Sequence, residues 1–208
     1  MSLASLDPPP WERRREYGTL NALVVTIRLV LFSPDRLFSR MPVGLGLLQP
    51  LLFAVVVALV GALFDWMWAL ATGNLPSVLA PGLARAIRGP YFTAAHFLLS
   101  PAVAVVVVFV RAAVFHGVLV VLGCNRLGFE ATFRVVAYCR ATRLLSILPF
   151  CGGIAGLVWE LVATVIGLAR IHDCATGKAV LAVVLPVVVI AVSLGGWILT
   201  LLGMAALR

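Results

Sequence analysis

The stretch Ala102–Val110, AVAVVVVFV, decides the class of this protein. It contains no polar side chain, and the apolar character extends on both sides over residues 99–122, broken mainly by Arg111 and His116. An α-helix needs about 20 mainly apolar residues to cross the hydrocarbon core of a bilayer. The stretch therefore predicts a transmembrane helix over residues 99–122.

The composition of the whole chain supports the same class. Of its 208 residues, 62% are hydrophobic and only 12% are charged, against about 25% charged in an ordinary soluble domain. A soluble fold would have to expose a very large apolar area. Because lipid-exposed backbone must satisfy its own hydrogen bonds, we expect an all-α integral membrane bundle.

Five transmembrane helices are expected in a membrane domain over residues 44–205. The third and fourth form a hairpin whose turn contains Pro149, Gly152 and Gly153. The alternative is a single span near 145–169 preceded by an interfacial helix, which gives four spans. The five expected spans cover residues 46–71, 99–122, 131–148, 152–170 and 179–202.

The N-terminal part is expected to lie outside the bundle. Residues 1–19 are polar and proline-rich, which is typical of a disordered cytoplasmic tail. Residues 20–43 are predicted to form an interfacial amphipathic helix and a linker, because Leu20–Phe32 is too short to cross a membrane. The sequence Ser33-Pro34-Asp35 ends this helix, and a short helix is expected around residues 36–41.

Basic residues predict the orientation. Cytoplasmic loops carry an excess of Lys and Arg, and the basic residues here gather in the N-terminal tail, after the second span, and after the fourth span at Arg170 and Lys178. Five spans place all three segments on one side, whereas four spans separate the last from the others. We therefore expect a multi-pass protein of the bacterial inner membrane, with a cytoplasmic N-terminus and the C-terminus outside.

Two ionisable residues are expected at membrane depth. Arg111 lies near the middle of the second span and Glu160 near the middle of the fourth. One charge buried alone costs about 2.5–3.5 kcal/mol or more, so we predict an Arg111–Glu160 ion pair. This pair is either a lock between helices or part of a transport or lipid-headgroup site.

Other polar and small residues suggest contacts at the edges of the bundle. Arg140 and Arg143 are three residues apart on one helical face, near the expected cytoplasmic surface, and could bind lipid headgroups or act as snorkelling anchors. Asp65 is predicted to be an interfacial residue in an aromatic belt. A further group, Gly152, Gly153 and Gly156, predicts close helix packing.

The sequence contains no motif for catalysis, a metal or a cofactor, so we expect a protein that is not an enzyme. The basic residues flank apolar runs instead of forming one polar face, which argues against nucleic-acid binding. The cysteines have no CxxC spacing and are interpreted as small apolar residues in or beside helices; they are Cys124, Cys139, Cys151 and Cys174.

The order of several short motifs resembles the Yip-domain family of membrane proteins, here its prokaryotic branch. The resemblance covers about residues 28–190, and each motif is short, so order and spacing carry it. Asp35-Arg36-Leu37 departs from the more aromatic pair that the family often has, and so does the Arg-rich third span. The motifs are LFSPDRLFSRM at residues 31–41, PLLFA at 50–54, FRVVAY at 133–138, Leu148-Pro149 with Gly152-Gly153, Trp159, Ile166-Gly-Leu168, His172 and Lys178-Ala179.

The resemblance implies a five-span bundle with a cytoplasmic N-terminus and a role in membrane organisation, trafficking or as an adaptor. Eukaryotic members bind prenylated Rab-type GTPases, but the Ala-, Val- and Arg-rich composition with one lysine is typical of a high-GC bacterium. The expected partners are therefore the lipid bilayer, a second copy, or another membrane protein. A small transporter or channel subunit that uses Arg111 and Glu160 is the alternative.

Overall fold

The computed structural model describes residues 6–71, 90–149 and 151–206. This part of the chain forms helices and no strand, which confirms the expected all-α class. The first residues of the N-terminal tail lie outside the described residues, as do Arg85 and Arg88 in the connection between the first two expected spans.

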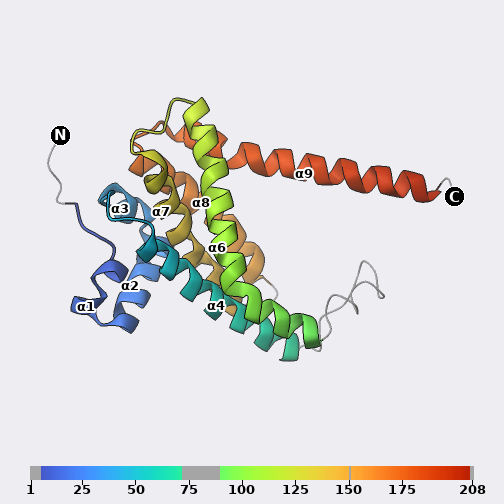
Figure 1. Ribbon diagram of the computed structural model, residues 1–208, viewed down its shortest axis with the longest axis horizontal. Coiled ribbons are helices and arrows are strands. Elements are labelled where there is room, and N and C mark those ends of the chain that lie inside the picture. Colours follow the sequence, from blue (N-terminus) through green and yellow to red (C-terminus); the bar gives the residue numbers. More distant parts are fainter. Residues whose placement is uncertain (1–5, 72–89, 150, 207–208) are drawn as a thin grey trace.

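Four helices are long and apolar enough to cross a membrane. They are α4 (Leu48–Ala71), α6 (Pro90–Val121), α8 (Gly152–Ile171) and α9 (Thr176–Ala206). They cover the first, second, fourth and fifth expected spans to within a few residues, except that α6 begins nine residues earlier. Figure 1 shows the C-terminal part of α4 beside the N-terminal part of α6, in agreement with the contacts between these two helices.

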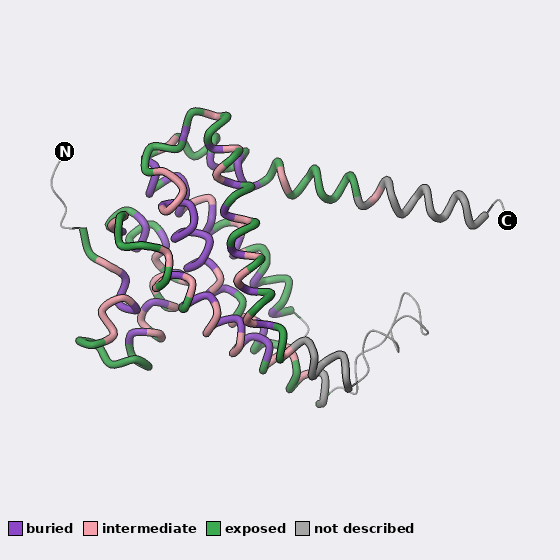
Figure 2. Tube along the Cα trace, in the orientation of Figure 1, coloured by how far each residue is buried: buried purple, intermediate pink, exposed green. Residues whose placement is uncertain are grey.

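The third expected span consists of two pieces, α7 (Gly128–Cys139) and the 3₁₀ helix η2 (Arg140–Ile147). All nine residues over 131–139 are buried, and the two pieces contact α4, α6 and α8 (Figure 2). A segment enclosed by protein does not need an apolar surface toward lipid. This position explains the polar side chains over residues 131–139, whereas in η2 Arg143, Ile147 and the following Leu148 are exposed.

Two glycines allow η2 and α8 to approach closely. A Cβ atom on Gly152 would lie 2.0 Å from the carbonyl oxygen of Leu145, and one on Gly156 would lie 2.8 Å from that of Thr142. A Cβ on Gly153 would meet nothing within 4 Å. Gly152 and Gly156 therefore lie at a close contact between helices, whereas Gly153 has no such contact within this chain, and its assignment to helix packing stays a prediction.

The N-terminal segment folds onto the bundle. It forms η1 (Pro10–Arg13), α1 (Arg14–Tyr17), α2 (Thr19–Phe32) and α3 (Pro34–Ser39). The expectation of a disordered tail over residues 1–19 is wrong for residues 10–17. Trp11 anchors them: it is buried, its indole Nε1–H donates to the carbonyl oxygen of Gln49 (2.9 Å), and its backbone N–H donates to Thr26 Oγ1 (2.9 Å).

The last helix leaves the bundle after its first turns. Ala179, Ala182 and Val183 are buried against the neighbouring helices, and α9 contacts α8 and α6. Beyond these residues the helix extends away from the other elements (Figure 1). Its next apolar side chains, over 184–192, are mostly exposed and form a surface that suits lipid or another membrane helix.

The contact between η2 and α8 predicts different effects for two neighbouring glycines. Gly156→Ala places a methyl group against a backbone carbonyl, so we expect a loss of about 1–3 kcal/mol in stability. Gly153→Ala is the matched control, because the added methyl group fills open space in the first turn of α8 and should change the stability little. Thermal unfolding in detergent measures both. Equal melting temperatures for the two variants would contradict the close approach.

Candidate functional site

Glu160 on α8 is the centre of a charged cluster within the bundle. Arg111 on α6 donates from Nη1 to Glu160 Oε1 in a close ion pair. The Glu160 side chain is only 7% exposed, and that of Arg111 is 23% exposed. The structure therefore brings together the two residues that the sequence placed at equal depth.

Arg140 on η2 is a second cation at the same carboxylate. Its Nη1 lies 3.2 Å from Glu160 Oε1, so one carboxylate connects α6, η2 and α8. Arg143 instead donates from Nη2 to Asp65 Oδ2 at 2.7 Å, near the C-terminal end of α4. The expectation that Arg140 and Arg143 lie near the cytoplasmic surface and bind lipid headgroups stays a prediction; the structure gives each of them a carboxylate partner within the chain.

A second charged cluster fixes the N-terminal segment. Arg134 on α7 is fully buried and donates from Nη2 to Glu12 Oε1 on η1 in a close ion pair. The hydroxyl of Tyr138 donates to the same oxygen at 2.6 Å, and Arg134 Nη1 donates to the carbonyl oxygen of Gly46 at 3.2 Å. Sequence reasoning missed Glu12, since its only local signal is a carboxylate within a proline-rich tail.

The linker before α4 is held by Glu130, near the start of α7. Glu130 Oε1 accepts three backbone N–H groups, from Gly44 at 2.9 Å, Leu45 at 3.0 Å and Gly46 at 3.1 Å. Gly44 and Gly46 have φ angles of 88° and 82°, which residues with a Cβ rarely adopt. Consecutive N–H groups in such a turn form a concave site for an anion, and here the anion is part of the chain.

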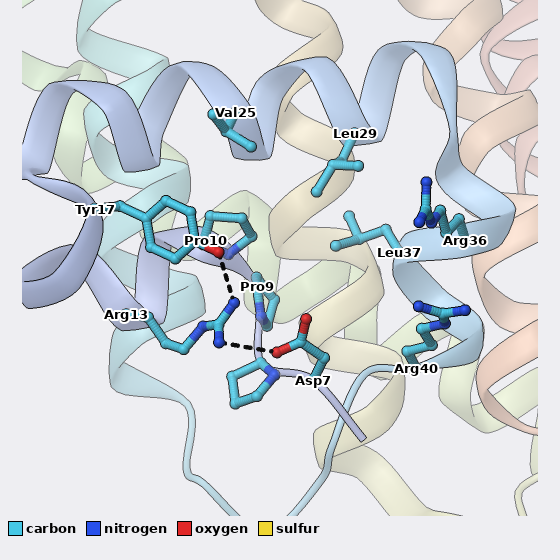
Figure 3. Close-up of a pocket in the computed structure, with 11 residues that line it drawn as sticks. Asp7, Pro9, Pro10, Arg13, Tyr17, Val25, Leu29, Arg36, Leu37 and Arg40 are labelled. Atoms are coloured by element: carbon cyan, nitrogen blue, oxygen red, sulfur yellow. Dashed lines mark hydrogen bonds and ion pairs between the residues drawn. The ribbon is translucent and has the colours of Figure 1, made fainter. Parts of the chain in front are cut away.

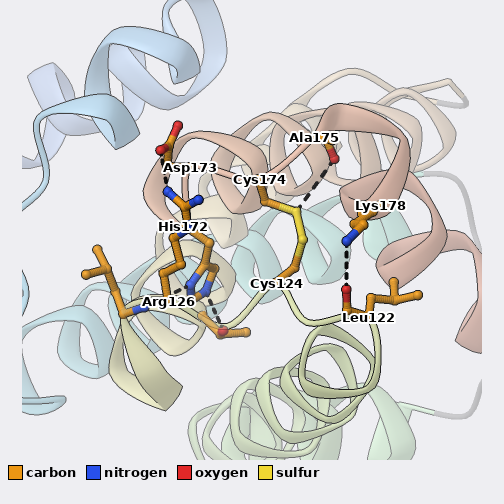
Figure 4. Close-up of a disulfide and its surroundings, with 10 residues drawn as sticks. Leu122, Cys124, Arg126, His172, Asp173, Cys174, Ala175 and Lys178 are labelled. Carbon is orange, nitrogen blue, oxygen red and sulfur yellow. Dashed lines mark hydrogen bonds and ion pairs between the residues drawn. A yellow bond between two sulfur atoms is a disulfide. The ribbon is translucent and has the colours of Figure 1, made fainter. Parts of the chain in front are cut away.

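A disulfide between Cys124 and Cys174 joins the loop between α6 and α7 to the loop between α8 and α9 (Figure 4). Beside it, Arg126 Nη1 lies 2.6 Å from Asp173 Oδ2, and Lys178 Nζ donates to the carbonyl oxygen of Leu122 at 2.9 Å. The interpretation of these two cysteines as no more than small apolar residues in or beside helices is therefore wrong. Their separation of 50 residues gives no pairing signal in one sequence.

Two histidines are connected through one threonine at this end of the bundle. Thr132 Oγ1 lies 2.9 Å from His172 Nε2 and 3.1 Å from His116 Nδ1, and His172 Nδ1 accepts the backbone N–H of Leu127 at 3.4 Å. The bond at Nδ1 leaves the proton of the neutral ring on Nε2. Burial, and then the nearby His116, lower the pKa of His172 from 6.5 to about 4.

The family model of the Yip1 domain matches residues 28–198. The chain belongs to the Yip1 domain family. Together with the four apolar helices, this makes it a multi-pass integral membrane protein. No curated protein and no solved structure matches it.

The Yip1 domain contains most of the clusters described above but not all of the residues that hold it together. Arg111, Arg140 and Glu160 all lie within the matched region, whereas Trp11 and Glu12 precede it. Within the docked N-terminal segment, η1 and α1 thus precede the family match, whereas α3 lies inside it. In the described part of the chain, no group of three or more His, Cys, Asp or Glu side chains could hold a metal ion.

The charged cluster predicts a large cost when its carboxylate is neutralised. Glu160→Gln leaves two largely buried guanidinium groups without a counter-charge, and breaking a buried pair costs about 3–5 kcal/mol. We expect a clearly lower melting temperature in detergent. Glu16→Gln is the matched control, since Glu16 is exposed on α1 and should change little. A Glu160→Gln variant as stable as the control would show that the pair does not stabilise the bundle.

The lowered pKa of His172 predicts acid sensitivity. Below pH 6.5 the unfolded chain binds a proton at this ring, whereas the folded chain does so only near pH 4, so stability falls as the pH drops through this window. His172→Gln keeps a side-chain donor and acceptor but cannot titrate. We expect a smaller loss of melting temperature between pH 6.5 and 4 in this variant than in the wild type. Identical pH profiles would contradict the assignment.

Proposed function

We propose that α7 and η2 together form a third crossing of the membrane, which gives the Yip1 domain five spans. Twelve α-helical residues at 1.5 Å each and eight 3₁₀ residues at 2.0 Å each have a combined length of about 34 Å. The hydrocarbon core is about 30 Å thick. Two observations support the proposal: this length, and the enclosure of α7 by α4, α6 and α8.

The proposed orientation has a cytoplasmic N-terminus in a bacterial inner membrane and the C-terminus outside. It rests on the basic residues of the N-terminal segment and of the loops after α6 and α8. The disulfide between Cys124 and Cys174 lies in these same loops, and disulfides are rare in a reducing cytoplasm. We give the distribution of basic residues more weight than the disulfide, because positive charge sets the orientation while the chain is inserted into the membrane. In this orientation the two cysteines form their bond only under oxidising conditions.

Cysteine labelling tests the number of spans and the orientation together. Cys151 is exposed in the turn before α8, whereas Cys139 is buried. Because Cys124 and Cys174 would be free thiols in a reducing cytoplasm, both are replaced by serine in the labelled protein. Five spans place Cys151 and an introduced Arg15→Cys on opposite sides of the membrane. With an impermeant maleimide on intact cells, we expect Cys151 to react from outside and the cysteine at position 15 to react only after permeabilisation.

The other outcomes of this labelling are equally informative. Reaction of both positions from the same side would establish an even number of crossings between them and would exclude α7–η2 as a span. Reaction of position 15 from outside and of Cys151 from inside would keep five spans and reverse the orientation. Cys151→Ser is the control, since it should abolish labelling of the same protein without Arg15→Cys.

We further propose that the protein is not an enzyme and acts as a membrane-organising protein or adaptor. The observation that carries this proposal is the folded N-terminal segment, which Glu12 fixes to Arg134 at one end of the bundle. One face of α2 in this segment exposes Leu20, Val24 and Phe32, with the exposed Arg28 between the last two. An apolar stripe with one basic side chain suits the membrane interface or a partner that lies at it. A second copy or another membrane protein is the proposed partner; a Rab-type GTPase applies only in a eukaryote.

Cross-linking in intact membranes tests the adaptor role. We expect a reproducible cross-linked partner for the wild type and a clear loss of it for Val24→Ser combined with Leu20→Ser, which removes the exposed apolar stripe. Val106→Ser is the matched control, because it changes an exposed apolar residue on α6 instead. A solute flux in liposomes that Glu160→Gln abolishes while the fold survives would contradict the proposal and favour a transporter.

A further inference from the structure

The N-terminal segment forms an open cavity of about 200 Å³, lined by residues that precede α2 and by side chains of α2 and α3 (Figure 3). Its lining combines an apolar floor with a basic rim. Pro9 and Pro10 come from the start of the segment, and the floor is completed by side chains of α2 and α3 that face them, namely Val25, Leu29 and Leu37. A cavity with this lining suits a ligand that has both an apolar and an anionic part.

The rim carries more positive than negative charge. Arg13 is neutralised by Asp7, with Arg13 Nη1 3.2 Å from Asp7 Oδ1, and it also donates to the hydroxyl of Tyr17 at 2.9 Å. Arg36 and Arg40 also line the cavity and are exposed. Neither of them forms an ion pair with any residue that the structure describes. The cavity therefore has two cations without a counter-charge.

The two free arginines are positioned to act together. Arg36 is in α3 and Arg40 is its C-terminal capping residue, four positions later, so their side chains leave the helix on the same side. Figure 3 shows both guanidinium groups near Leu37, at the same end of the cavity. Guanidinium groups bind phosphate oxygens through paired, charge-assisted hydrogen bonds. Two such groups beside an apolar floor are therefore suited to a phosphate monoester or diester that carries an apolar chain.

The exposed stripe of α2 argues for lipid as the source of that phosphate. Leu20, Val24 and Phe32 are 78%, 53% and 79% exposed, and they suit the boundary between headgroups and acyl chains. The same helix contributes Val25 and Leu29 to the cavity. A helix that lies in the interface in this way places the cavity at the level of the headgroups.

We propose that this cavity binds the phosphate of an anionic phospholipid, with Arg36 and Arg40 as donors and the apolar floor against the glycerol and the first acyl carbons. This site deepens the proposed adaptor role, because it would fix the N-terminal segment on an anionic membrane surface. Free inorganic phosphate presents the same kind of oxygen atoms to Arg36 and Arg40, but it leaves the apolar floor of the cavity without a contact.

Titration of the purified full-length protein in maltoside detergent tests the proposal. The probes are dihexanoyl phosphatidic acid, dihexanoyl phosphatidylcholine and inorganic phosphate, with binding followed by calorimetry. We expect saturable binding of phosphatidic acid, and affinity about 100-fold lower in the double variant Arg36→Gln/Arg40→Gln, since each charged hydrogen-bond donor contributes about tenfold or more. Arg15→Gln removes an exposed arginine outside the cavity and should keep the wild-type affinity.

Each alternative has its own result. An equal loss of affinity for phosphatidic acid in Arg15→Gln would show that general positive charge attracts the lipid. Unchanged affinity in the double variant would exclude the cavity as the binding site. Either result overturns the proposal. Inorganic phosphate that binds as tightly as phosphatidic acid would assign the site to a free anion, and equal binding of phosphatidylcholine would remove the anionic preference. Because the cross-linked partner of the adaptor test is measured separately, loss of lipid binding with the partner retained rejects this site alone.

Discussion

The bundle depends most on the contacts that the carboxylate of Glu160 makes with two guanidinium groups. This carboxylate accepts hydrogen bonds from Arg111 on α6 and Arg140 on η2, so three segments meet at one largely buried oxygen atom. A lone charge of either sign would be costly at that depth. The polar third segment can lie in the bundle because its charges find partners there and because α4, α6 and α8 surround it.

Much of this fold could be predicted from the sequence, because lipid imposes strict rules on length and hydropathy. Those rules gave four helices to within a few residues, apart from the start of α6, and the depth argument placed Arg111 opposite Glu160. The third segment was harder to predict. Its polar side chains reflect enclosure by protein, and hydropathy describes only what faces lipid.

Features that depend on three-dimensional proximity were not predictable. A single sequence cannot show that Cys124 reaches Cys174, that Glu12 reaches Arg134, or that Arg140 is the second partner of Glu160, because each contact joins segments far apart in the chain. The disorder expected for residues 1–19 came from proline content and polarity. Proline content and polarity do not show that Trp11 and Glu12, through their contacts with the bundle, can order a short segment.

Hydrogen–deuterium exchange in lipid nanodiscs measures whether α7, which carries buried polar side chains, is the enclosed centre of the bundle. Helix α7 (Gly128–Cys139) is compared with α2 (Thr19–Phe32), which is of similar length but has an exposed face. Exchange reports the free energy of local opening. The structure predicts that the amides over residues 131–139 are among the slowest to exchange and clearly slower than those of α2. Exchange of α7 as fast as that of α2 would contradict an enclosed centre and place this helix at the membrane surface.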